Sequence, residues 1–263
     1  NGRVIDMVSV EVKNFQHSAL PNAAELAREY ADSLPRDPID WVIEARDYEL
    51  MEQDVRNATV QRSSPILIEN NAIDAFLTTQ GYEGHGAELS YLMGLSAGDA
   101  YSKSAVFSIH EEDVQLHKRI ADYGNALDLD CTIVKHQDEL ENSISLRSRE
   151  VCGNGLGRHL NTNNPFFAAL KHFGLSDSKN VPEFLVTEKI AYREHFLAGL
   201  VDSDGYVKKE PMPCATIKTI HESVRDGVIA VARSLGIRAS VDTTKSTAIQ
   251  NGPAKEYSLN LSG

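Results

Sequence analysis

The amino-acid sequence predicts an α+β protein that contains two similar halves. Residues 188–205 and 88–99 each have the pattern of an apolar helix with a small residue in its middle and an aspartate at its carboxyl end. A similar order of strands and helices follows each of these two helices. Their final aspartates, Asp99 and Asp204, lie 105 positions apart. We therefore interpret the chain as a divergent internal repeat whose halves pack as a pseudo-two-fold pair.

The composition is ordinary for a globular protein, but the charge is uneven. No apolar run reaches membrane-spanning length, and the three cysteines form no CxxC pair, which disfavours a zinc site or disulfide framework and fits a reducing compartment. The net charge of −12 argues against a nucleic-acid partner, because phosphate contacts need Lys and Arg. However, residues 1–154 carry a net charge of −14 and residues 155–263 carry +2, so the second half is better suited to face a polyanion.

The amino-terminal region is predicted to be distinct from the repeat. Residues 4–12 are strand-like, residues 22–34 are helical, and an amphipathic stretch runs from residue 41 to about residue 58. Residues 63–65, Ser-Ser-Pro, mark a boundary. Because the chain begins without Met and stops just after a strand-like stretch, it is expected to be a fragment or an excised piece.

The first half begins with residues 66–80, which are helical or mixed, and a glycine-rich loop leads to helix 88–99. The second half begins after a short helix at 166–173 and an extended linker that contains Lys179. The pentapeptides Ser108–Glu112 and Thr219–Ser223 both contain Ile-His-Glu and support the repeat. The further predicted elements are strand 104–109, helix 113–127 and strands 131–135 and 143–147 in the first half, and strand 215–220, helix 224–235 and strands 238–241 and 256–261 in the second.

The two aspartates are predicted to form a metal site. The carboxyl end of a helix is unfavourable for an acid, because the helix dipole is negative there. Close packing through Gly94 and Gly199 would bring Asp99 and Asp204 together, and two adjacent carboxylates repel unless cations lie between them. Paired acids with bound Mg²⁺ are suited to phosphodiester hydrolysis, in which a nearby lysine stabilises the developing charge.

The same residues suggest three other interpretations, and the EF-hand interpretation fails. Each helix can be an ordinary amphipathic helix that ends in a turn. An EF-hand loop counted from Asp202 would need glycine at the sixth position, where Val207 stands. A glycoside-hydrolase carboxylate pair is chemically possible, but its acid and base need different environments, whereas the two halves are nearly symmetric.

The motif itself identifies a family resemblance. Residues 196–205, Phe-Leu-Ala-Gly-Leu-Val-Asp-Ser-Asp-Gly, closely resemble the LAGLIDADG dodecapeptide, and residues 92–100 resemble a weaker first copy. From about residue 38 onward, most of the chain is similar to the homing endonuclease of the fungal vacuolar ATPase intein. The stretches that carry this similarity are residues 41–47, 152–155, 160–165, 179–185, 215–227 and 232–236.

The resemblance implies an architecture. It implies two pseudo-symmetric αββαββα LAGLIDADG subdomains packed through the motif helices, the first at residues 63–183 with its linker and the second at residues 184–263. Residues 1–62 would be a partial intein splicing domain and DNA-recognition region. The protein is expected to be a monomer with internal pseudo-two-fold symmetry and no membrane association. It is expected to be intracellular, in the host cytoplasm, and to act in the nucleus.

The resemblance also implies an activity, site-specific cleavage of double-stranded DNA at a long asymmetric target, with Mg²⁺ or Mn²⁺. Asp99 and Asp204 match the family's metal-binding acids, and Lys179 matches its catalytic lysine. Asp202 aligns with Ala97 and is not expected to be a ligand. The residues expected to contact DNA are Arg46, Lys208, Lys209, Lys218, Thr219 and His221.

Several departures from the family keep other functions open. The chain lacks the terminal residues that protein splicing needs, and it stops before a second catalytic lysine, so the second subdomain is expected to be truncated. The first motif ends in Gly-Asp-Ala rather than Gly-Asp-Gly, and His110 stands where the family has an acid. One alternative is a degenerate, catalytically silent DNA- or RNA-binding derivative. Another is a regulatory or protein-interaction role for the acidic first half.

Overall fold

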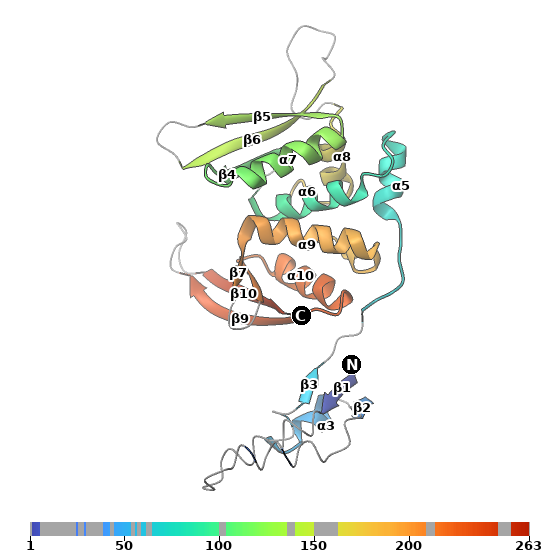
Figure 1. The fold of residues 1–263 in the computed structure, drawn as a ribbon, viewed down its shortest axis with the longest axis vertical. Coiled ribbons are helices and arrows are strands. Elements are labelled where there is room, and N and C mark those ends of the chain that lie inside the picture. The colour runs from blue at the N-terminus through green and yellow to red at the C-terminus, as the bar shows by residue number, and fades with distance from the viewer. Residues whose placement is uncertain are drawn as a thin grey trace. The chain divides into compact units, whose positions relative to one another are not determined.

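The computed structural model divides the chain into two units, Asn1–Ser64 and Pro65–Gly263. The described residues of the larger unit are 65–99, 104–135, 140–149, 163–208, 214–246 and 254–262 (Figure 1). Those of the smaller unit are 2–5, 25, 29, 39–42, 45–53, 56 and 59–61.

The smaller unit contains a three-stranded antiparallel sheet of order β2-β1-β3. Its elements are β1 (Gly2–Ile5), β2 (Ile39–Val42), α3 (Ala45–Glu49) and β3 (Thr59–Gln61). The amphipathic stretch predicted from residue 41 therefore begins as a strand, in which Trp41 pairs with Arg3. Aromatic and β-branched residues favour strands, and pairing with β1 makes residues 39–42 a strand and not a helix. Most of the predicted strand 4–12 and helix 22–34 lie outside the described residues.

The first half of the larger unit places its helices against one sheet. Its strands form an antiparallel sheet of order β4-β6-β5, whose core-facing side chains include Phe107, Ile144 and Leu146, all fully buried. The elements are α5 (Ala72–Thr79), α6 (Gly86–Asp99), β4 (Val106–His110), α7 (Val114–Ala126), β5 (Leu129–Lys135), β6 (Glu141–Ser148) and α8 (Pro165–His172).

The second half repeats this order around a four-stranded antiparallel sheet, β7-β8-β10-β9. Its elements are a 3₁₀ helix η1 (Glu183–Thr187), α9 (Ile190–Asp204), β7 (Gly205–Lys208), β8 (Cys214–Thr219), α10 (Glu222–Ser234), β9 (Arg238–Ser246) and β10 (Ala254–Ser262). The predicted strand-like stretches did not include β7, but the αββαββα order implied by the resemblance has a strand there. By the spacing of the repeat, its counterpart in the first half would fall at residues 100–103, outside the described residues.

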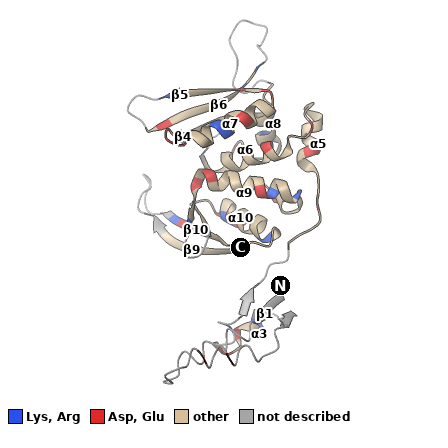
Figure 2. Ribbon diagram, viewed as in Figure 1, with Lys and Arg blue, Asp and Glu red and all other residues tan. Residues whose placement is uncertain are grey.

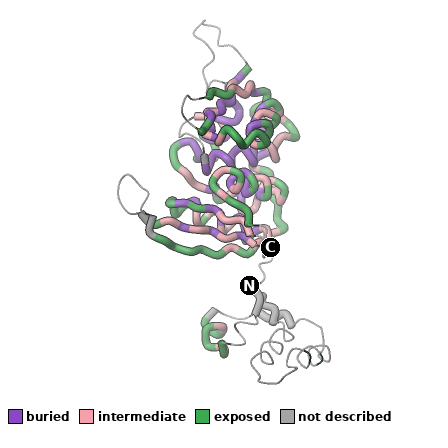
Figure 3. The backbone as a smooth tube through the Cα atoms, turned by 60° about the vertical axis from the view of Figure 1, so that its left-hand side comes forward, coloured by how far each residue is buried: buried purple, intermediate pink, exposed green. Residues whose placement is uncertain are grey.

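Helices α6 and α9 pack against each other between the two sheets (Figure 1). The predicted fold class, an α+β protein with two pseudo-symmetric halves joined through the motif helices, is confirmed. Buried residues are concentrated along these helices and the inner faces of the sheets (Figure 3). Among the residues that the structure describes, no helix is both long and apolar enough to cross a membrane.

One detail of the predicted repeat is wrong. Ile109 of the first Ile-His-Glu is 2% exposed and faces the core, whereas Ile220 of the second is 45% exposed. Ile109 lies within β4, whereas Ile220 follows the last residue of β8, Thr219, so the two tripeptides do not occupy equivalent positions. The order and packing of the elements support the repeat. The short Ile-His-Glu match does not.

Candidate functional site

The crossing of α6 and α9 depends on two glycines. A Cβ atom on Gly94 would lie 2.0 Å from the Phe196 carbonyl oxygen, and one on Gly199 would lie 2.1 Å from the Tyr91 carbonyl oxygen. Gly199 and Phe196 follow Gly94 and Tyr91 by the same 105 positions that separate the two aspartates. The same backbone contact is therefore made twice, once from each half, and close packing through the two glycines is confirmed.

This packing brings the carboxyl ends of the helices together. A Cβ atom on Gly98 would lie 2.0 Å from the Ser203 Oγ and 3.1 Å from the carboxyl carbon of Asp204. Gly98 immediately precedes Asp99, the last residue of α6. Acidic positions accordingly gather where α9 meets β7 (Figure 2). Asp204 is exposed to solvent, and the side chain of Asp99 lies outside the part that the structure describes.

Lys179 reaches the same place from the linker. Its ammonium group donates a hydrogen bond to the carbonyl oxygen of Gly98, and its own carbonyl oxygen accepts one from the hydroxyl of Ser223 at 2.9 Å. The last carbonyls of a helix lack partners within the helix and carry its negative dipole end, so a lysine is favourable there. The structure thus joins Lys179, the end of α6 and the start of α10.

Asp202 belongs to a different network. Its Oδ2 accepts hydrogen bonds from the Tyr91 hydroxyl at 2.5 Å and from the Arg119 Nη1 at 2.7 Å. Burial and the bond to Asp202 raise the pKa of Tyr91 well above its usual value. Asp202 therefore links α9 to α6 and α7. The sequence did not reveal Arg119, which lies 83 positions away.

The residues predicted to contact DNA lie in several environments. Lys208 and Lys218 are exposed on the outer face of the second sheet. Thr219 is 9% exposed and faces the helices, where its Oγ1 accepts a hydrogen bond from the backbone N–H of His221 at 3.1 Å. His221 itself is exposed at the start of α10.

Two other predicted contacts are not placed at this sheet. Arg46 belongs to the smaller unit, where it is exposed, with its Nε 3.7 Å from Asp47 Oδ1. Lys209 lies outside the described residues.

Comparison with known proteins adds an independent finding. Residues 180–263 match the homing endonuclease family. The homothallic switching endonuclease of Saccharomyces cerevisiae is 30% identical over 267 residues, which cover 92% of this chain and 44% of that protein. The chain resembles the homing endonucleases. The catalytic subunit of the V-type proton ATPase of Candida tropicalis is 27% identical over 300 residues, 98% of this chain and 27% of that protein.

The chain spans less than half the length of each of these two relatives. Solved homing endonuclease structures are also similar. The crystal structure of I-DmoI with DNA and Mn matches with a TM-score of 0.43 and 17% identity, over 68% of this chain and 91% of that chain. I-DmoI with DNA and Ca matches with a TM-score of 0.41 and 17% identity, over 68% and 85% of the two chains.

The donors at the helix ends suit one kind of metal site. Among the described residues, no three His, Cys, Asp or Glu side chains gather closely enough to hold a metal ion. The exposed carboxylate of Asp204 supplies hard oxygen donors instead. Mg²⁺ fits such a donor set, because it binds through one or two carboxylates and keeps several waters or substrate phosphates.

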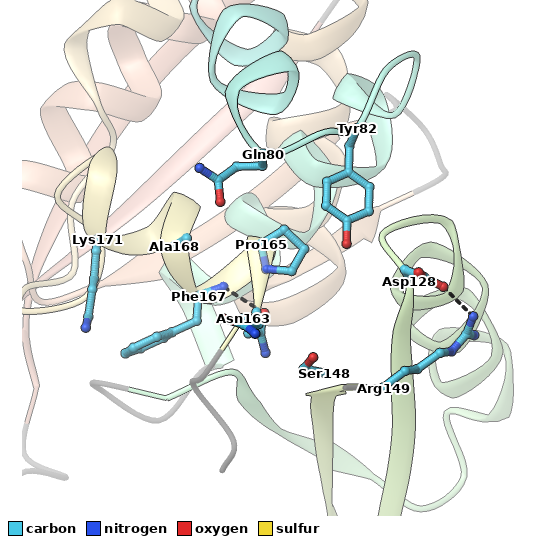
Figure 4. Close-up of a pocket in the computed structure, with 11 residues that line it drawn as sticks. Gln80, Tyr82, Asp128, Ser148, Arg149, Asn163, Pro165, Phe167, Ala168 and Lys171 are labelled. Carbon is cyan, nitrogen blue, oxygen red and sulfur yellow. Dashed lines mark hydrogen bonds and ion pairs between the residues drawn. The ribbon is translucent and has the colours of Figure 1, made fainter. Parts of the chain in front are cut away.

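The larger unit also has a pocket of about 490 Å³ that the helix-end residues do not line (Figure 4). Asp128, Arg149 and Lys171 are among the residues that line it. Arg149 donates to Asp128 at 2.6 Å, to Asp130 at 3.0 Å and to Asn125 at 2.8 Å, so local partners already engage its guanidinium. None of the predicted catalytic residues lines this pocket.

Proposed function

We propose that this chain is a site-specific endonuclease that hydrolyses phosphodiester bonds in double-stranded DNA, with Mg²⁺ or Mn²⁺ held by Asp99 and Asp204. The observation that carries the proposal is the meeting of the carboxyl ends of α6 and α9, where Lys179 contacts the Gly98 carbonyl. Similarity to an endonuclease over 92% of the chain supports it.

Each residue of this site has a chemical role in the proposal. Asp99 and Asp204 would hold the metal through carboxylate oxygens contributed by the two halves. A bound metal ion would lower the pKa of a water and stabilise charge on the phosphate oxygens. Lys179 would place a positive charge beside the scissile phosphate and balance the charge that develops there.

The outer faces of the sheets would hold the duplex. Lys208 and Lys218 are exposed cations on one such face, and we propose that they contact phosphates. His221 would act from the start of α10, with Thr219 fixing its backbone. We retain Lys209 and Arg46 as proposed contacts, with Arg46 in a separate recognition region.

The family resemblance also suggests the target and the setting. We propose that the target is a long asymmetric sequence at the uninterrupted insertion site of an intein in a vacuolar ATPase gene. The protein would act as a monomer on nuclear DNA, with residues 63–183 and 184–263 as its two subdomains and residues 1–62 as a partial splicing and recognition region.

A cleavage assay tests the proposal. The chain is incubated with a labelled duplex that carries the uninterrupted insertion site, in Mg²⁺, Mn²⁺ or chelator, and a scrambled duplex serves as the control. We expect linear products from the first duplex only, and only with metal. Binding without cleavage in either metal would refute the endonuclease and identify a silent DNA-binding derivative, and failure to bind at low salt would refute both.

A further inference from the structure

The outer face of the second sheet carries a hydrogen-bonded row of polar side chains. Ile217, Leu259 and Leu261 are buried against the helices, so the residues that alternate with them point outward. Thr216 and Asn260 are directly paired on that outward side. Asn260 is half-buried in β10, which lies between β8 and β9.

Two bonds fix the orientation of the Asn260 amide. The Thr216 hydroxyl donates to Asn260 Oδ1 at 2.9 Å, and Asn260 Nδ2 donates to Asp242 Oδ2 at 3.0 Å. A carboxylate can only accept, so the NH₂ group must face Asp242 and the carbonyl oxygen must face Thr216. The row therefore sets which side of the amide is the donor and which is the acceptor.

The amide keeps further hydrogen-bonding capacity. Its oxygen has two lone pairs and its NH₂ group has two hydrogens, and each of the two bonds uses one of these. One donor and one acceptor remain side by side. This arrangement matches the edge of adenine in the major groove, where N7 accepts and the N6 amino group donates.

Charged residues on the same face fit a duplex. Lys208, Lys218 and Arg238 are exposed on the outward side of the second sheet, around the row. They outnumber the acids Asp242 and Glu256 there, although Lys218 Nζ lies 3.9 Å from Glu256 Oε2. Cations of this kind hold the phosphates and set the register, whereas base-edge contacts carry sequence information. Both parts of a recognition surface are thus present together.

We propose that Asn260 is a specificity-determining residue that reads one adenine of the DNA target, with Thr216 and Asp242 as positioning residues that orient its amide. This inference rests on the proposed function, because it assumes a double-stranded DNA ligand on this face. It adds a base-reading residue that the motif and the predicted contacts did not include.

The test selects preferred sequences from a random duplex library, without cleavage, for the full chain and its variants. We expect the native chain to select adenine at one position, and Asn260→Ala to reduce that preference by about tenfold while the other positions keep theirs. Thr216→Val should reduce the same preference more weakly, because it removes only the orienting donor. Ser258→Ala, on the same face of the same strand, is the matched control and should change nothing.

The outcomes separate this inference from the proposed function. Equal selection of adenine by the native chain and Asn260→Ala would overturn the inference alone. A loss of base preference at every position in Asn260→Ala, with an unchanged circular dichroism spectrum, would also overturn it. If the native chain selects no sequence, the proposed function fails first, and the inference fails with it.

Discussion

The two sheets of the larger unit hold equivalent positions in the repeat but differ in their outer faces. The described charges on the outer face of β4-β6-β5 are Arg147, Asp130 and Glu141, and Arg149 at the end of β6 is bound to Asp130, so acids and cations balance. The corresponding described charges on β7-β8-β10-β9 are Lys208, Lys218, Arg238, Asp242 and Glu256, so cations exceed acids.

The inner parts of the two halves are much more alike. The contact between Gly94 and Phe196 recurs between Gly199 and Tyr91, because both helices must approach closely enough for their backbones to touch. Packing constrains these positions tightly, whereas an outer sheet face meets only solvent or a ligand. A divergent repeat therefore keeps its symmetry at the helix pair and can lose it on the sheets.

A large effect on cleavage is expected from the lysine at the helix ends. Lys179→Met should lower the single-turnover cleavage rate by about a hundredfold to a thousandfold, because it removes the cation beside the helix ends. DNA affinity should change little. Lys171→Met, on the surface of α8, is the control and should cleave normally. A native rate for Lys179→Met would mean that the helix ends are not the reacting site.

The symmetry of the helix pair can be tested by stability. Gly94→Ala and Gly199→Ala should each lower the free energy of unfolding in urea by about 3 kcal/mol, because the new Cβ atom meets a backbone oxygen that cannot rotate away. Ala198→Ser, on the exposed side of α9, should cost about 0.5 kcal/mol or less. If one glycine variant is as stable as the native chain, the contact is not equivalent in the two halves.

The contrast between the outer faces can be tested by salt dependence. The double variant Lys208→Gln, Lys218→Gln should reduce the slope of log affinity against log salt by about two, because two phosphate contacts are lost. Arg147→Gln on the first sheet should reduce it less, since the Arg147 Nε is engaged by Ser145 Oγ at 3.2 Å. An equal or larger effect of Arg147→Gln would mean that the first sheet contacts DNA phosphates at least as strongly as the second.

A smaller effect is expected where α5 contacts the start of α9. Burial raises the pKa of Asp74, but hydrogen bonds from Lys189 and Tyr192 outweigh it and hold that pKa below its ordinary value of 3.8. The ionised carboxylate therefore stabilises the fold above about pH 4, and this contribution is lost as the pH falls through the lowered pKa. Asp74→Asn should lower the Tm by a few degrees at pH 7 and have a much smaller effect near pH 3. A difference that persists undiminished at pH 3 would contradict this role.

The repeat and the helix pair were predictable from sequence because they depend on local periodicity and small residues. Gly94 and Gly199 indicated close packing, and the motif located Asp99 and Asp204 at helix ends. The ends of the strands were not predictable in the same way. The two Ile-His-Glu segments look alike in sequence, but Ile109 is buried within β4 and Ile220 is exposed just after β8.

Contacts between residues far apart in the chain could not be predicted from the sequence either. The bond between Asp202 and Arg119 joins two elements of opposite halves, and no local pattern marks it. The row from Thr216 through Asn260 to Asp242 depends on the pairing of three strands. The contact of Lys179 with Gly98 likewise depends on the path of the linker. The family resemblance suggested a role for Lys179, but hydrophobic periodicity did not.

Asp204→Asn tests most directly whether the two helix ends form a metal-dependent cleavage site. Cleavage and binding are measured on the same labelled duplex, with Asp202→Asn as the control, since asparagine can still accept the bonds from Tyr91 and Arg119. We predict that Asp204→Asn loses about a thousandfold or more in cleavage and binds within about fivefold of the native chain, while Asp202→Asn still cleaves. Retained cleavage by Asp204→Asn would mean that Asp204 does not hold the metal needed for cleavage.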